Sequence, residues 1–178
     1  MGLCVNDTVA IIAQEKVDRE VAMPRLEDLS ELQRKNILFF PCLESDTAPF
    51  TPMKKELSRS KVALVTSAGL HLRDDAPFGP GDTSFRVIPS GTKASEILQS
   101  HSSIGFDHTA FYRDINVTFP VDRLQELVAR GVIGSVSENY YSYMGAERDP
   151  KDFIEKTGPE VASLMIDEGV DVVFITPT

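Results

Sequence analysis

Two of the three histidines in this chain lie in one short polar segment, residues 100–109. Asp107 and His108 could form a carboxylate–imidazole pair, in which the carboxylate raises the basicity of the ring and fixes its tautomer. His101 could join them as a metal ligand. The spacing matches no zinc pattern, and no cysteine lies near the segment, so we predict that the chain binds no metal.

His71 and Arg113 are further candidates for contact with a substrate. His71 follows a turn at the end of a predicted strand, where ligands bind in open α/β sheets. Its alternative role is that of a loop histidine with an ordinary hydrogen bond. Arg113 could bind a substrate carboxylate through two parallel hydrogen bonds, or it could form a solvated ion pair with Asp114.

Three tyrosines lie within residues 140–143, just past a predicted strand. A phenol such as that of Tyr143 could donate to a bound carboxylate, or the rings could simply cover the end of the sheet. The two cysteines, Cys4 and Cys42, are either unrelated free thiols, or Cys42 has a redox or thioester role. No phosphate-binding glycine loop, nucleophilic serine elbow or Cys-x-x-Cys pair is present.

The elements that position these residues alternate between strand and helix. Residues 61–69 form a continuous apolar run that ends in glycine, as expected of a buried parallel strand. Residues 120–130 and 159–168 predict amphipathic helices, each with proline near its start and glycine after its end. We expect short strands at residues 84–88 and 132–136, a long loop at 70–92, and a buried strand at 170–175.

This order predicts an α/β fold with a mostly parallel sheet and flanking helices, a Rossmann-like three-layer arrangement that is incomplete at the C-terminus. We expect two parts. Residues 1–47 form an N-terminal extension with a short amphipathic helix near residues 26–34, and residues 48–178 form the core.

Charge and hydrophobicity exclude several classes of partner. The net charge of −9 argues against a nucleic-acid backbone or an anionic membrane, because both require a basic face. The longest apolar runs are too short to cross a bilayer, and the N-terminus lacks the features of a secretion signal. We therefore predict a cytoplasmic protein.

Several segments together resemble the selenoprotein B family, which contains the glycine, sarcosine, betaine and D-proline reductases. They are residues 50–72, Phe106-Asp107-His108-Thr109, and residues 113–124, 132–135 and 141–145. The resemblance covers roughly residues 48–178. The short sequence that precedes the last strand favours the D-proline reductase type, and the glycine, sarcosine or betaine reductase component B is the alternative.

The resemblance also implies where the nucleophile lies. In the family, the strand similar to residues 170–178 is followed at once by selenocysteine or cysteine. We therefore expect no catalytic residue within this chain, a nucleophile directly after Thr178, and a UGA codon there that translation reads as a stop. The residues that would surround or bind the substrate are His71, Asp107, His108, Arg113 and Tyr143.

The reaction implied by the resemblance is reductive cleavage of a C–N bond in a small amino acid, as in the opening of D-proline to 5-aminovalerate. A pyruvoyl group on a partner subunit would bind the nitrogen, and the selenolate would attack the α-carbon. A second thiol would then close a selenium–sulfur bond that an external dithiol or thioredoxin-like protein reduces. The resemblance therefore implies an oxidoreductase of the class that acts on X–H and Y–H to form an X–Y bond, with a disulfide as the acceptor. The rival interpretations are a non-catalytic domain that binds a small carboxylate, and a thiol enzyme that uses Cys42.

Overall fold

The computed structural model describes residues 25–39, 46, 50–103, 106, 108–147 and 149–177. The chain divides into two units, Met1–Asp46 and Thr47–Thr178. In the first unit, a 3₁₀ turn at Leu26–Asp28 precedes helix α2, Glu31–Leu38. Ser30 begins this helix with a capping box, because its hydroxyl accepts from Gln33 N and the Gln33 side chain accepts from Ser30 N. Cys4 and Cys42 lie outside the described residues.

The second unit contains seven strands, three α-helices and a π-helical turn among its described residues. The strands are β1 (Lys61–Thr66), β2 (Leu70–Leu72), β3 (Phe85–Pro89), β4 (Ile97–Gln99), β5 (Ser135–Val136), β6 (Asn139–Tyr143) and β7 (Val172–Thr176). The helices are α3 (His108–Arg113), α4 (Val121–Ala129) and α5 (Gly158–Asp167), and the π-helical turn Phe153–Thr157 leads into α5. Short 3₁₀ turns lie at Leu57–Arg59, Ala94–Glu96 and Ile115–Val117.

Strand β1 is the centre of the main sheet and runs parallel to three others. Strand β7 pairs along one edge of β1, from Val62↔Val172 to Thr66↔Thr176. Strands β5 and β6 share the opposite edge, β5 beside the start of β1 and β6 beside its end. Strand β3 adds to β6 in the antiparallel direction. The predicted α/β fold with a mostly parallel sheet is confirmed, and its Rossmann-like detail stays a prediction.

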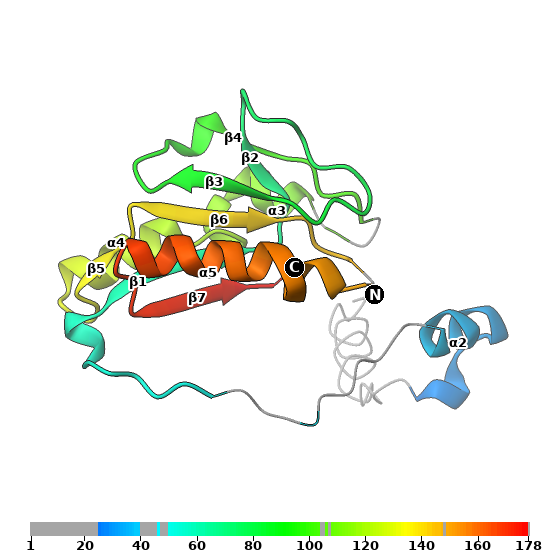
Figure 1. Cartoon of the computed structure of the whole chain (residues 1–178). Coiled ribbons are helices and arrows are strands. Elements are labelled where there is room, and N and C mark those ends of the chain that lie inside the picture. The colour runs from blue at the N-terminus through cyan, green and yellow to red at the C-terminus, as the bar shows by residue number, and fades with distance from the viewer. Residues whose placement is uncertain are drawn as a thin grey trace, which may run out of the picture. The chain divides into compact units, whose positions relative to one another are not determined.

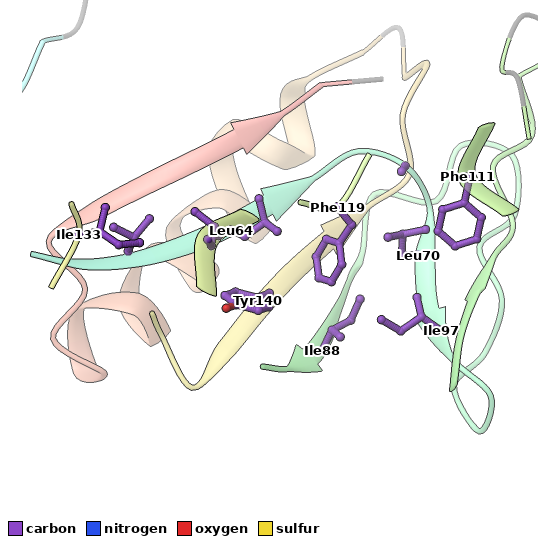
Figure 2. Packing of buried hydrophobic residues seen from close by; sticks show 11 residues of the cluster. Leu64, Leu70, Ile88, Ile97, Phe111, Phe119, Ile133 and Tyr140 are labelled. Carbon is purple, nitrogen blue, oxygen red and sulfur yellow. The ribbon is translucent and has the colours of Figure 1, made fainter. Parts of the chain in front are cut away.

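Helices cover both faces of this sheet, with α5 on one side and α3 and α4 on the other (Figure 1). Successive side chains of β1 therefore enter different clusters, because side chains alternate across a strand. Leu64 packs in the larger cluster with Phe119 and Leu124, whereas Ala63 packs with Val161 of α5. Figure 2 shows the larger cluster, which continues through Leu70, Ile88, Ile97 and Phe111 toward the β2–β4 ribbon.

Strand β6 corrects the predicted position of the tyrosines. They do not cover the end of the sheet but form the strand beside β1, with Tyr140 and Tyr141 almost completely buried. The two rings enter opposite clusters, Tyr140 that of Leu64 and Tyr141 that of Ala63. Burial raises the pKa of each phenol to about 12, so both remain protonated at neutral pH.

Two further expectations are wrong in part. The predicted loop at residues 70–92 begins instead with β2, which pairs antiparallel with β4. Strand β7 forms as predicted but is not buried, since Val173, Phe174 and Ile175 are 41%, 46% and 63% exposed. Within the described residues, β7 has a strand neighbour on one edge only. Among the same residues, no helix combines the length and hydrophobicity that crossing a bilayer requires.

Candidate functional site

A cavity of about 320 Å³ lies at the carboxyl ends of the parallel strands. Ser67 after β1, Tyr143 and Met144 at the end of β6, and Ile175 and Pro177 of the β7 segment contribute to its wall. Ligands of open α/β sheets bind at this end because the loops that follow the strands converge there. The cavity is therefore the first candidate for a binding site.

Hydrogen bonds from threonine hydroxyls link the ends of β1 and β7 beside this cavity. Thr66 Oγ1 donates to the Thr118 carbonyl at 3.0 Å, and Thr176 Oγ1 donates to the same carbonyl at 2.8 Å. The backbone N–H of Ser67 donates to Thr176 O at 3.3 Å. The ends of β1 and β7 are thus fixed relative to the residue that leads into α4.

Among the predicted site residues that the structure describes, only Tyr143 lies in the wall of this cavity. Its hydroxyl donates to the Thr157 carbonyl at 3.0 Å, so the phenol already has an acceptor within the chain. Burial raises its pKa. The adjacent turn contains Ala146 with φ of 60°, in the left-handed region that residues with a Cβ rarely adopt. Such strained backbone occurs often at functional sites.

His101 and His108 both lie next to this end of the sheet. His108 Nδ1 lies 2.9 Å from Gln99 Oε1, and Gln99 Nε2 donates to Ala68 O at 3.1 Å. The Phe106 ring contacts both histidines, stacked on His101 with centroids 4.4 Å apart and edge-on to His108 at 5.1 Å. Asp107 lies outside the described residues, so its pairing with His108 stays a prediction.

His101, considered in the sequence only as a possible metal ligand, is buried in the structure. The Ser103 N–H donates to its Nδ1 at 3.2 Å. Its Nε2 has no hydrogen-bond partner among the described residues. Burial, together with the nearby His108, lowers the pKa of His101. One of its neighbours, Gly69, is distant in the sequence and lies against the His101 backbone.

The other two predicted residues lie elsewhere. His71 is buried within β2, with its Nδ1 2.8 Å from Leu72 O, and strand alternation places it on the face opposite Leu70 and Leu72. Arg113 ends α3 and lines a different cavity of about 490 Å³. Its predicted ion-pair partner, Asp114, accepts instead from Asn116 N and Nδ2, and these bonds lower the pKa of Asp114.

Polar groups also gather at the opposite, amino end of the strands. The Glu168 carboxylate accepts from the Ser137 hydroxyl and from Asn139 Nδ2, the latter at 2.7 Å. Lys61 Nζ donates to the Glu168 carbonyl at 2.7 Å. Burial alone would raise the pKa of Glu168, but these hydrogen bonds hold it below its usual value. In the described part of the chain, no three His, Cys, Asp or Glu side chains gather as a metal site would require.

Comparison with known proteins identifies the family. The family model described as glycine/sarcosine/betaine reductase selenoprotein B matches residues 85–178. D-proline reductase subunit gamma of Acetoanaerobium sticklandii is 41% identical over 128 residues, which cover 71% of this chain and 52% of that protein. No solved structure matches the chain.

More distant relatives belong to other reductase complexes. Sarcosine reductase complex component B subunit beta of Peptoclostridium acidaminophilum is 28% identical over 78% of this chain and 33% of its own length. Glycine reductase complex component B subunit gamma of Carboxydothermus hydrogenoformans is 29% identical over 75% of this chain and 31% of its own length. The chain thus spans about half the length of the first relative and about a third of the other two. On these matches, the chain belongs to the glycine/sarcosine/betaine reductase selenoprotein B family.

Proposed function

We propose that this chain is part of the selenol- or thiol-bearing subunit of an amino-acid reductase of the D-proline type. The identity of 41% with the D-proline reductase subunit, against 28% and 29% with the sarcosine and glycine reductase subunits, supports D-proline as the substrate. The relatives are components of reductase complexes, which supports a role within a complex.

The observation that carries this proposal is the position of Pro177. It lines the cavity at the strand ends together with Ser67 and Tyr143. A selenocysteine or cysteine directly after Thr178 would begin at this cavity, where α/β proteins bind their ligands. Thr66 and Thr176 would hold the strand that precedes it, through their hydrogen bonds to Thr118 O.

The proposed reaction consumes two electrons and two protons from an external dithiol. The C–N bond of the substrate breaks, a C–H and an N–H bond form, and the dithiol becomes a disulfide. The selenolate or thiolate would attack the α-carbon, and the electron pair of the C–N bond would leave with the nitrogen. The proposal includes a pyruvoyl-bearing partner subunit that binds this nitrogen, a thioredoxin-like reductant and a cytoplasmic location.

The first test is the DNA that encodes the chain. The proposal expects an in-frame UGA or cysteine codon directly after codon 178, followed by an open reading frame. An ordinary stop codon with no downstream frame contradicts it.

The second test is turnover. The protein translated through this codon, combined with the pyruvoyl-bearing subunit and dithiothreitol, should convert D-proline to 5-aminovalerate. The 178-residue chain in the same mixture should be inactive, as should a variant with serine at the reactive position. Turnover of glycine, sarcosine or betaine in place of D-proline would change the assigned substrate and keep the reaction class.

A further inference from the structure

A π-helical turn, Phe153–Thr157, contributes Phe153 to the wall of the cavity at the carboxyl ends of the strands, here called the strand-end cavity. The Gly158 N–H closes the turn by donating to Phe153 O, five residues earlier. A Cβ on Gly158 would clash with this same oxygen, so the turn requires glycine at this position. Such turns are rare in proteins and are found frequently at functional sites.

Tyr143 holds this turn against the end of β6. Its hydroxyl donates to Thr157 O at 3.0 Å, and its ring lies edge-on to that of Phe153, with centroids 5.3 Å apart. The Tyr143 ring also packs against Phe85, at a centroid distance of 6.0 Å. Phe153 is half-buried, so it packs on Tyr143 and remains accessible from the cavity that it lines.

The wall of the strand-end cavity is mostly apolar. Hydrocarbon groups come from Val65, Met144, Phe153 and Ile175. No lysine, arginine or histidine lines the cavity among the described residues, and the charged residue in its wall is the acidic Glu147. This wall therefore offers no cation to the carboxylate of an amino acid, and it favours the hydrocarbon part of a ligand.

We propose that this wall packs against the pyrrolidine ring of D-proline and that Phe153 determines the preference for this ring, an inference that rests on the function proposed above. Glycine has no hydrocarbon ring, and sarcosine has a single methyl group in its place. Burial of each additional CH2 group strengthens binding, so an apolar wall discriminates against the smaller substrates. The identity of 41% with the D-proline reductase subunit, against 28% and 29% with the sarcosine and glycine reductase subunits, agrees with this preference.

The inference can be tested without turnover, by NMR of the methionine methyl groups in the 178-residue chain. D-Proline should shift the methyl resonance of Met144, which lines the cavity. Cyclopentanecarboxylate, which keeps a five-membered ring and lacks the nitrogen, should do the same, and glycine at the same concentration should not. The Met165 methyl, which packs in the cluster of Ala63 and Val161, is the internal reference. An equal shift with glycine, or no shift with D-proline, overturns the inference.

Substitutions at the turn test the role of the Phe153 ring. Phe153→Ala should weaken D-proline binding about 10-fold, and Phe153→Leu, which retains an apolar side chain, should weaken it less. Gly158→Ala should also weaken binding, because the added Cβ displaces the turn that presents Phe153. Gly79→Ala, with open space around its Cβ, is the matched control and should bind as the wild type does. Thermal unfolding checks that each variant folds, and unchanged affinity in folded Phe153→Ala contradicts the inference.

Other occupants of the strand-end cavity would be recognised in the same titration. If betaine shifts the Met144 resonance and cyclopentanecarboxylate does not, the aromatic rings bind a cation and the inference is wrong. If the protein translated through codon 178 loses the response to D-proline, the segment after Thr178 fills the cavity and the inference is again wrong. The proposed function is decided separately, by the downstream codon and by turnover.

Discussion

Among the described residues, the Glu168 network at the amino end of the parallel strands has its hydrogen-bonding groups paired, whereas two buried polar atoms at the carboxyl end have no partner. At the amino end, the Glu168 carboxylate accepts from Ser137 and Asn139. At the carboxyl end, His101 Nε2 and Thr118 Oγ1 are buried with no partner among the described residues. The carboxyl end also contains Ala146 in the left-handed region and a cavity of about 320 Å³.

This difference separates residues that stabilise the fold from residues that are available to a ligand. Buried polar groups in proteins nearly always have partners, and each exception requires an explanation. A saturated network such as that of Glu168 has nothing to offer a ligand, so its role is structural. Groups without partners lower stability, and they persist where binding provides the missing partner. The following changes should therefore affect the two ends in opposite ways.

The largest effect is expected at the amino end, for Glu168→Ala. This change leaves the Ser137 hydroxyl and the Asn139 amide without their acceptor, and hydrogen bonds to charged groups are among the stronger ones. The free energy of unfolding should fall by about 3 kcal/mol in urea denaturation. Asp167→Ala, at the exposed neighbouring position, is the control and should change it by less than about 0.5 kcal/mol. Equal effects would mean that the network contributes nothing.

The same network should make stability depend on pH. The folded-state pKa of Glu168 lies below its ordinary value of 4.5, so the carboxylate contributes its full stabilisation above pH 4.5. This contribution is lost as the pH falls through the lowered pKa. Urea denaturation at a series of acidic pH values should show the wild type losing more stability than Glu168→Gln. Parallel curves for the two proteins would contradict the prediction.

A pair of smaller changes should have different signs at the two ends. Ser137→Ala removes a buried donor to Glu168 and should lower the free energy of unfolding by about 1–2 kcal/mol. Thr118→Val removes a buried hydroxyl that has no partner and should leave the free energy unchanged or raise it by up to about 1 kcal/mol. The Thr118 carbonyl that holds Thr66 and Thr176 is retained in this variant. A clear loss of stability in Thr118→Val would show that its hydroxyl is satisfied after all.

The smallest effect concerns the strained turn at the carboxyl end. Ala146→Gly should raise the free energy of unfolding by about 0.5 kcal/mol, because relief of the left-handed strain exceeds the entropic cost of glycine. Gly131→Ala is the matched control. It introduces a Cβ at a φ of +68° with open space around it, and it should lower stability by about 1 kcal/mol. If both substitutions act in the same direction, Ala146 is not strained.

The sequence predicted the elements whose signals are local. The apolar run of β1 is continuous in the sequence. In α4 and α5, the proline near the start of the helix and the glycine after its end are about ten residues apart. Strand β6 was missed because Asn139 to Tyr143 contains no aliphatic residue, and its tyrosines are buried only because β1, β3 and α5 surround them. Strands β2 and β4 have three residues each and depend on pairing with each other across 24 intervening residues, 73–96.

The candidate site was predicted in position but not in composition. The carboxyl end of the strands was expected to hold it, and Tyr143 lies there. His71 was expected in the same place because it follows β1 closely, but strand alternation in β2 directs it to the other face. His101 was considered only as a metal ligand, and its burial could not be predicted because it depends on contacts with Gly69, Ser103 and Phe106.

The exposed edge of β7 has a practical consequence for handling the 178-residue chain. Within the described residues, its Val-Val-Phe-Ile-Thr segment has backbone groups on one edge that pair with no strand, and its apolar side chains are 41% to 63% exposed from Val173 to Ile175. Natural edge strands usually carry lysine, proline or a bulge that discourages intermolecular pairing, and this segment carries none of them. Concentrated preparations should therefore be prone to aggregation that begins at β7, and low concentration and mild solubilising additives are the appropriate starting conditions for work with the isolated chain.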